Sequence, residues 1–282
     1  MAATAAIPLE DELGDVIDKA LHCAGLTVEE AAERAGVPAV KIRDAIDYRP
    51  DFAPGELARL AAALGLNEVG LCALAAGRYP RPAIARLPFE VWPVRMPHGI
   101  GVANAYVVAE RSSPRGLLFD TGSCLAALEA AWPPPIREVA AVFLTHVEAE
   151  HAGGLCEVVA RFGVEAAFIP DGASAPCGRG VAEGWAGSFG GLEVRAFATP
   201  GHAAAHNCYA VGKAANPGSP GLLLSGDLVF AGSAGGGYFS APQLRMHLRR
   251  LLGALPPETL IAPGHGPMTT VGNERRFNPF AA

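Results

Sequence analysis

The sequence predicts an α/β domain that follows a small all-α domain. Apolar residues recur at helical spacing through the first eighty residues, whereas from Phe89 onward short β-rich runs alternate with helical segments. Half of the 282 residues are apolar, which is enough for a sizeable core. Strands alternating with helices indicate a sheet-based domain with helices on the outside. We place the helical domain at residues 1–80, a linker at 81–86 and the α/β domain at 87–282.

Five short helices are expected in the first eighty residues. Their apolar positions repeat every three or four residues from Leu13 to Leu74, and glycine or proline interrupts the pattern between helices. Thr27 and Asn67 suit helix N-caps, because their side chains can accept hydrogen bonds from the free N–H groups of a first turn. The prolines of residues 79–82 disfavour helix and indicate the linker.

The remaining residues are expected to form short strands, three helices and a glycine-rich loop at 171–191. The strands are expected at 89–94, 104–110, 116–119, 139–144, 165–169, 192–198, 207–211, 221–224 and 259–262. The helices are expected at 123–131, 155–162 and 241–252. A second glycine-rich segment, 235–238, is expected to form a loop at the mouth of the site; its Tyr238 is either a substrate contact or an ordinary loop aromatic.

The composition indicates a cytoplasmic protein. A net charge of −6 argues against general attraction to nucleic acid or to an anionic membrane. No apolar stretch reaches the roughly 18 residues that a membrane span needs, and no basic segment precedes an apolar one at the N-terminus. The six cysteines contain no CxxC pair, which favours reduced thiols over a disulfide framework.

One stretch carries the strongest indication of chemistry. Residues 145–154 read THVEAEHAGG and follow a buried apolar run. In an extended segment His146, Glu148 and Glu150 would point to one side, and His151 would add a fourth ligand before a helix that starts near Gly153. Imidazole nitrogens and carboxylate oxygens suit zinc, iron or manganese. A solvated polar loop is the alternative for these ten residues taken alone.

Polar groups of the same kind follow three later strands. The segments are TPGH at 199–202, SGD at 225–227 and PGHG at 263–266, and Asp120 ends an earlier strand. Each group taken alone is typical of an ordinary turn. Four such groups at strand ends, in this order, favour a metal site.

Residues 87–282 resemble the metallo-β-lactamase fold superfamily, an αββα sandwich. The combination of TPGH, HNCY, SGDLVFAGS and the tail PGHGPMTTVGNERRFNPF is similar to the glyoxalase II-like branch, which hydrolyses thioesters such as hydroxyacylglutathione. The resemblance implies a dinuclear metal-dependent hydrolase that acts on a small-molecule thioester or related ester. It also implies two divalent metal ions, which are zinc, iron or manganese.

The resemblance assigns a ligand set residue by residue. It makes His146 and His202 ligands of one ion and His151 and His265 ligands of the other, with Asp227 bridging both. Glu150 would lie beside the second ion, and either Glu150 or Asp227 would orient the attacking water. Asp120 would orient a ligand histidine. His206, four residues after His202, is either a group that faces substrate or supports a ligand, or a surface histidine. The sequence assigns no role to His98 or His247.

The chain departs from the motif of the family's hydrolases, His-x-His-x-Asp-His. Glu148 replaces the second histidine and Glu150 replaces the aspartate. Glu148 can coordinate through oxygen, which shifts the preference of the first site from zinc towards iron or manganese. Glu150 has one extra methylene, so its carboxylate must fold back to reach the position of an aspartate.

Two other branches of the superfamily remain as alternatives. Glu148 also resembles the His-x-Glu-x-Asp pattern of flavodiiron and related proteins, which bind or reduce oxygen or nitric oxide; His151 would then not be a ligand. The mononuclear iron persulfide dioxygenases are the other branch, and their ligand set leaves Glu148 and His265 unexplained.

Residues 26–66 resemble the helix-turn-helix of the Cro/repressor-like family, with 27–35 and 38–47 as its two central helices. Residues 1–80 contain seven basic and thirteen acidic residues, and the resulting charge of −6 repels phosphate on average. We therefore favour a docking, dimerising or substrate-covering role over DNA binding. A metal-domain sensor coupled to a DNA-binding module remains an alternative, and a homodimer is expected from the resemblance alone.

Overall fold

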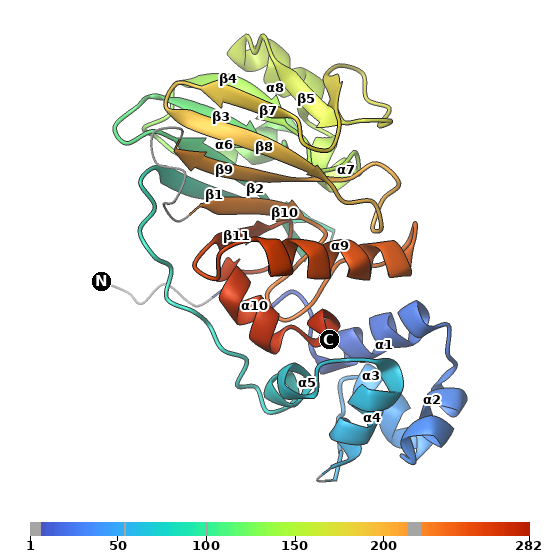
Figure 1. Cartoon of the computed structure of the whole chain (residues 1–282). Helices are drawn as coiled ribbons and strands as arrows, with labels where there is room; N and C mark the ends of the chain where they lie inside the picture. The colour runs from blue at the N-terminus through green and yellow to red at the C-terminus, as the bar shows by residue number, and fades with distance from the viewer. Residues whose placement is uncertain (1–6, 54, 100, 214–220) are drawn as a thin grey trace.

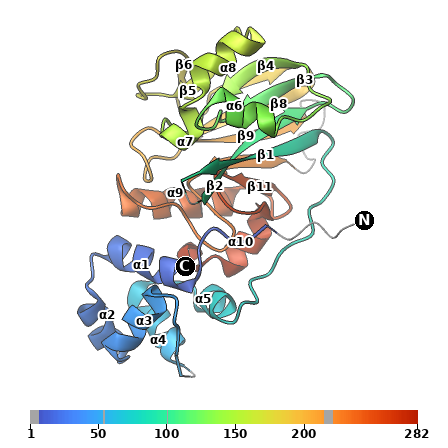
Figure 2. The ribbon, with the colours of Figure 1, turned by 180° about the vertical axis from the view of Figure 1, so that it is seen from behind.

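The computed structural model describes residues 7–53, 55–99, 101–213 and 221–282. Two six-stranded sheets lie face to face, with helices outside both (Figure 1). Viewed from behind, α6 (Leu125–Ala130) and α8 (Leu155–Phe162) cover the first sheet, and α9 (Ala241–Ala254) and α10 (Val271–Phe277) lie beside the second (Figure 2). The fold is the expected α/β sandwich, preceded by a helical region.

The first sheet begins with an antiparallel hairpin and ends in parallel strands. Its order follows the chain: β1 (Glu90–His98), β2 (Gly101–Ala109), β3 (Arg115–Phe119), β4 (Glu138–Phe143), β5 (Ala167–Pro170) and β6 (Arg179–Val181). Strands β3 to β6 are parallel, so their carboxyl ends meet at one edge. The short helix α7 (Ala149–Ala152) follows β4 at that edge.

The second sheet runs in reverse order from its outer edge. Its strands are β12 (Thr269–Thr270), β11 (Leu260–Pro263), β10 (Leu222–Gly226), β9 (Asn207–Lys213), β8 (Leu192–Ala198) and β7 (Ala186–Phe189). Strands β10 and β11 are parallel, which places the loops after them side by side. Aromatic side chains of both sheets, including Phe119, Phe143 and Tyr209, pack between the layers.

Helices α1 to α5 form the N-terminal region. They are α1 (Leu13–Ala24), α2 (Val28–Ala35), α3 (Ala39–Ile46), α4 (Glu56–Leu64) and α5 (Glu68–Ala75). Thr27 accepts a hydrogen bond from the Glu30 amide, and Asn67 accepts one from the Val69 amide, so both N-cap predictions are confirmed. Residues 78–87 contain no helix or strand.

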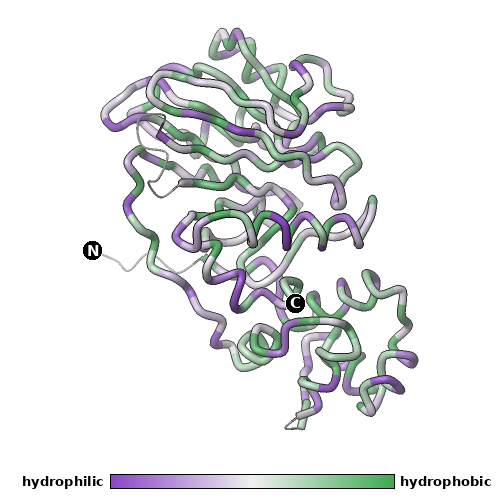
Figure 3. The backbone as a smooth tube through the Cα atoms, viewed as in Figure 1, coloured by the Kyte–Doolittle hydropathy of each residue, from purple (hydrophilic) through white to green (hydrophobic). Residues whose placement is uncertain are grey.

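The helical region shares one apolar core with the helices of the second sheet. Ile17 and Leu60 belong to the same buried cluster as Leu248 and Phe280. Hydrophobic residues run through both the helical region and the sheets (Figure 3), so both parts have apolar surface to bury. The side-chain amide of Asn67 also donates to the Arg276 carbonyl, which ties α5 to the C-terminal tail.

Two local expectations are wrong. The segment 171–191 is not all loop, because β6 and β7 lie within it and extend the two sheets at their edges. Residues 149–152 are not extended either: Glu148 is the N-cap of α7, and the helical turn directs Glu150 away from the line of His146 and Glu148. None of the described helices is long and apolar enough to cross a membrane.

The close approach of α5 to the C-terminal tail gives a test of the shared core. A Cβ on Gly70 would overlap the carbonyl group of Phe277, whereas a Cβ on the helical Gly253 meets no atom within 4 Å. We expect Gly70→Ala to lower the free energy of unfolding by about 1–3 kcal/mol through overpacking. Gly253→Ala, as the matched control, should lose nothing and gain up to about 1 kcal/mol. Urea unfolding measures both; equal effects would contradict the close packing of α5.

Candidate metal centre

Four loops at one edge of the sandwich bring ionisable side chains together. The loop after β4 carries His146, Glu148 and His151, and the loop after β8 carries His202. Asp227 follows β10, and His265 follows β11. Parallel pairing aligns the end of β3 with that of β4 in one sheet, and the end of β10 with that of β11 in the other. Because the two sheets lie face to face, these ends meet, and residues 119 positions apart in the chain converge.

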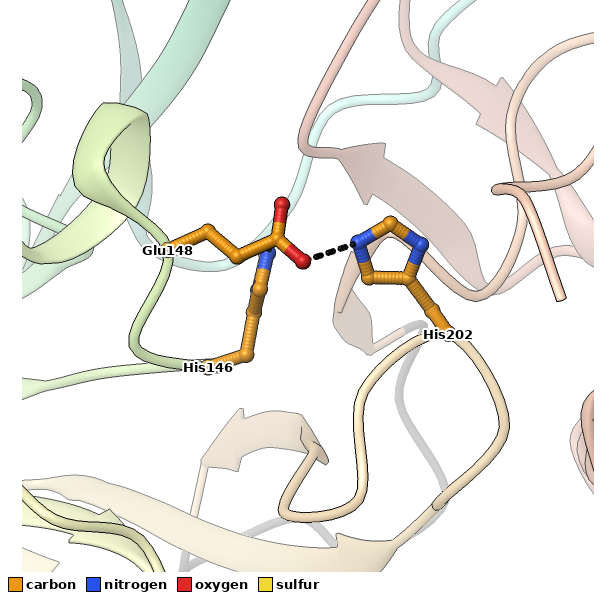
Figure 4. Close-up of side chains that lie close together, drawn as sticks. All are labelled: His146, Glu148 and His202. Atoms are coloured by element: carbon orange, nitrogen blue, oxygen red, sulfur yellow. Dashed lines mark ion pairs between the residues drawn. The ribbon is translucent and has the colours of Figure 1, made fainter. Parts of the chain in front are cut away.

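His146, Glu148 and His202 form the first group, with ligand atoms within 4.8 Å of one another. The Nε2 atom of His202 lies 3.2 Å from one Glu148 oxygen, and the Nε2 atom of His146 lies 3.9 Å from the other. Figure 4 shows the Glu148 carboxylate reaching over His146 towards His202. The two histidines are buried, whereas the Glu148 side chain is 41% exposed, so the group opens on the glutamate side.

His151 and His265 lie on the other side of Asp227. Their Nε2 atoms are each 3.5 Å from an oxygen of the Asp227 carboxylate and 3.4 Å from each other. The same carboxylate lies 3.7 Å from the Nε2 atom of His202. Asp227 therefore stands between the two groups, where one carboxylate can serve both.

The second nitrogen of each histidine ring is held by an oxygen. Nδ1 of His202 donates to the Gly236 carbonyl at 3.0 Å, and Nδ1 of His265 donates to the Val102 carbonyl at 3.1 Å. Because carbonyls only accept, the neutral form of each ring carries its proton on Nδ1 and leaves the Nε2 lone pair facing the centre. His146 and His151 make the corresponding contacts with Thr145 Oγ1 and Asp120 Oδ2.

Asp120 supports this arrangement from behind. Its carboxylate accepts the Thr145 amide at 2.7 Å and the Thr145 hydroxyl at 2.9 Å, and it faces Nδ1 of His151 at 3.1 Å. One buried carboxylate thereby orients His151 directly and His146 through the threonine. This is the position that the sequence resemblance predicts for Asp120.

Several atoms at the centre have no partner within the described part of the chain. Nε2 of His146, Nε2 of His202 and Oδ1 of Asp227 are buried and make no hydrogen bond there. Buried polar atoms are costly when unpaired, and these are lone-pair donors aimed at a common space. A set of four imidazole nitrogens with two carboxylates suits zinc, iron or manganese, so the residues fit the implied metal ions.

Glycine makes room for the central carboxylate. A Cβ on Gly264 would overlap Oδ1 of Asp227, and a Cβ on Gly235 would overlap the Asp227 carbonyl oxygen. The glycines of the PGHG and GGG motifs are therefore required sterically at these two positions, because a larger residue at Gly264 or Gly235 would collide with Asp227.

Burial and neighbouring charges shift the pKa values of the residues at the centre in different directions. Burial disfavours ionisation of Asp227, but His151 and His265 outweigh it and hold the Asp227 pKa well below its usual value. Burial and the neighbouring His151 lower the pKa of His146 to about 4. For His151, burial is outweighed by the charges of Asp227 and Asp120, which raise its pKa to about 9.

Glu150 lies outside both groups. Its carboxylate is 3.6 Å from Nε2 of His98, and its charge contributes to the raised pKa of His151. The helical turn of α7 accounts for this placement, since Glu150 leaves the extended line of the motif. A role of Glu150 as a ligand or in orienting water stays a prediction.

His206, for which the sequence left a supporting role and a surface position open, is buried beside Asp227. It directly precedes β9, where its Nε2 accepts the Asp227 backbone N–H at 3.2 Å and its Nδ1 lies 2.8 Å from the Thr199 hydroxyl. His206 thus positions the Asp227 backbone. Only the closeness of HNCY to TPGH in the sequence hints at this contact.

The family model described as the metallo-beta-lactamase superfamily matches residues 98–265, which span all the ligand candidates. The chain belongs to this superfamily. Among curated relatives, an Aquifex aeolicus protein is 29% identical over 211 residues, covering 66% of this chain and 95% of that protein. Hydroxyacylglutathione hydrolase of Xanthomonas campestris pv. campestris is 32% identical over 152 residues, covering 54% of this chain and 56% of the hydrolase, so the chain spans about half the length of that enzyme.

Solved structures show the same fold. BLEG-1 B3 metallo-beta-lactamase aligns with a TM-score of 0.56 at 23% identity, covering 68% of this chain and all of that one. TTHA1623, solved in a di-iron-bound form, aligns with a TM-score of 0.52 at 29% identity, covering 67% of this chain and 99% of its own. The superfamily and sandwich fold expected from the motifs are therefore confirmed, whereas the helix-turn-helix resemblance stays a prediction.

Metal uptake by the metal-free protein should release protons. The raised pKa of His151 keeps it protonated at neutral pH, and it must lose that proton before Nε2 can bind a metal. Asp227 is already ionised and contributes none. We expect release of at least about one proton per chain at neutral pH, with metal affinity rising as the pH approaches about 9. Calorimetric titration with Zn²⁺ in two buffers of different ionisation enthalpy measures the release, and identical heats would contradict it.

Proposed function

We propose that this protein is a dinuclear metal-dependent hydrolase that acts on a thioester or a related ester. The observation that carries the proposal is the arrangement around Asp227, where four histidines face a common space with their Nδ1 atoms held from behind. Membership of the superfamily and similarity to hydroxyacylglutathione hydrolases support it.

In this proposal the ligands form two sets that share Asp227. His146, Glu148 and His202 would hold one ion, and His151 and His265 the other. Two divalent ions held there would supply an activated water and polarise an acyl carbonyl. This assignment follows the contacts in the structure and leaves Glu150 outside the ligand set.

The protein's own residues fix orientation and charge. Asp227, ionised and anchored through its backbone by His206, sets the spacing of the two groups. Glu148 is the exposed member, so substrate would approach on its side. A thiolate, with a conjugate-acid pKa of about 8.5, leaves without a strong proton donor, which matches a centre built from imidazoles and carboxylates.

A second function is favoured by one specific observation. Glu148 lies within the first group, so each proposed ion has oxygen as well as nitrogen ligands, and such a set also suits iron. TTHA1623, which resembles this chain, was solved in a di-iron-bound form. Oxygen or nitric oxide chemistry at a diiron centre is therefore the alternative to hydrolysis.

For the helical region we propose a role at the catalytic domain rather than on DNA. Its two basic residues on α3 are already paired with acids: Lys41 with Glu56 at 2.9 Å, and Arg43 with Glu29. Side chains engaged in this way are poorly placed to contact phosphates or bases.

Metal content and thioester turnover test the proposal together. Protein purified without added metal or chelator should contain about two divalent ions per chain and hydrolyse a simple aryl thioester. Asp227→Asn should lose metal and lower kcat/KM at least about 100-fold, because it removes the shared carboxylate. Asp51→Asn, on an exposed loop, is the control. Two irons with ferric absorption and no turnover would instead support the diiron alternative.

Glu148 should determine which metal binds. Replacing it by histidine exchanges an oxygen ligand for nitrogen in the first group, so Glu148→His should shift the bound metal from iron or manganese towards zinc. Elemental analysis of both proteins after growth in the same medium measures the shift. An unchanged metal ratio would show that Glu148 is not a ligand.

A further inference from the structure

A cavity lies between the helical region and the metal centre. It has a volume of about 540 Å³ and is bounded by α1 on one side and by the loop Gly236–Tyr238 on the other. Both ribbon views show α1 beneath the end of α9 that this loop enters (Figures 1 and 2). The cavity is therefore built by two parts of the chain that are more than 200 residues apart.

The loop wall of the cavity is also part of the metal centre. The Gly236 carbonyl accepts the Nδ1 proton of His202 at 3.0 Å. The Tyr238 ring lies 5.4 Å from the His202 ring, measured between centroids, and 75% of Tyr238 is exposed. A molecule that fills the cavity thus reaches the residue that flanks a proposed metal ligand.

The helical wall is fastened to the same loop. Lys19 donates to the Ala234 carbonyl at 2.9 Å, and the Asp11 carboxylate accepts the Ser233 hydroxyl. Asp11 and Lys19 also pair with each other, and the Asp11 side chain is almost fully buried. These contacts hold α1 in place, so the cavity is a fixed feature of the folded chain.

The cavity is acidic on its helical wall. Three aspartates line this wall: Asp11, Asp15 and Asp18. Lys19 is the one lysine or arginine among the described lining residues, and it is already paired with Asp11. Asp15 accepts hydrogen bonds from the Tyr48 hydroxyl and the Glu12 amide, both uncharged donors. His22 is the other basic residue of the lining, and no ion pair of Asp15 or Asp18 occurs among the described residues.

The other lining groups suit an organic cation. Leu21, Leu26 and Val28 give the cavity an apolar portion, and the exposed Tyr238 ring offers an aromatic face. An alkylammonium group is attracted both by carboxylates and by an aromatic face, and its methyl or methylene groups bury against apolar side chains. An anionic group in the same place is repelled.

We propose that this cavity binds a positively charged alkylammonium group of the substrate, so that the enzyme prefers cationic thioesters or esters. The inference rests on the proposed hydrolase function and names its substrate class. It separates this chain from enzymes for glutathione thioesters, since glutathione carries two carboxylates and one ammonium group.

Three thioesters of different charge test the preference in the metal-loaded protein. Acetylthiocholine carries the cation, S-(3,3-dimethylbutyl) thioacetate is its neutral isostere, and S-lactoylglutathione is anionic. We expect kcat/KM for acetylthiocholine to exceed that of the isostere about tenfold, the factor that 1.4 kcal/mol represents. S-lactoylglutathione should be the poorest substrate. Equal kcat/KM for the cation and its isostere would overturn the inference and leave the proposed hydrolase standing.

Two variants locate the preference. Asp18→Asn removes an unpaired charge and Tyr238→Leu removes the aromatic face, and each should lower the ratio of cationic to neutral kcat/KM through the KM of the cation. Asp47→Asn, at the C-terminal end of α3 and outside the cavity lining, is the matched control and should keep the ratio. A ratio that is the same in Asp18→Asn, Tyr238→Leu and Asp47→Asn would overturn the assignment to this cavity.

A binding measurement separates the inference from the hydrolase proposal. If none of the three thioesters is hydrolysed, the proposed function fails, and calorimetric titration with choline then decides the inference alone. Binding that weakens in Asp18→Asn and Tyr238→Leu but not in Asp47→Asn supports a cation site. Absence of choline binding to the unmodified chain overturns it.

Discussion

The buried carboxylate of Asp227 is the constraint on which the rest of the centre depends. An ionised carboxylate in a protein interior is unfavourable unless other charges or hydrogen bonds compensate it. Here imidazoles from three loops surround it, His206 accepts a hydrogen bond from its backbone amide, and two glycines leave the space that it needs. The loops after β4, β8, β10 and β11 must therefore all lie close to Asp227. The sandwich makes this possible because these strands end at the same edge of its two sheets.

The loop that supports His202 is held from two sides, which links the helical region to the metal centre. On one side Lys19 and Asp11 bind the carbonyl and hydroxyl groups of residues 233 and 234. On the other side the buried carboxylate of Glu274 accepts the Gly232 amide at 3.0 Å and the Tyr79 hydroxyl at 2.9 Å. Movement of the helical region would consequently disturb the loop that fixes His202, so the helices form part of the site's architecture.

Two glutamates of the same motif have different surroundings for a reason that is purely conformational. Glu148 precedes the first turn of α7 with an extended backbone, and its side chain reaches His146 and His202. Glu150 lies within that turn and faces His98. A departure from a family motif therefore has to be judged by where the backbone directs each side chain, since the two substitutions introduce the same chemical group.

The sequence by itself determined the fold class, the helical start of the chain and the residue types at the strand ends. These features can be predicted because hydrophobic periodicity and turn residues are local properties of a sequence. The histidines and aspartates that follow apolar runs can be read directly from the amino-acid sequence. Only the tertiary structure decided which of these residues meet, because contacts between residues far apart depend on strand order and register. It placed Glu150 outside the two groups, buried His206 behind Asp227 and brought α1 against the loop beside Tyr238. Each of these outcomes arises from packing between segments distant in sequence, which no local pattern encodes.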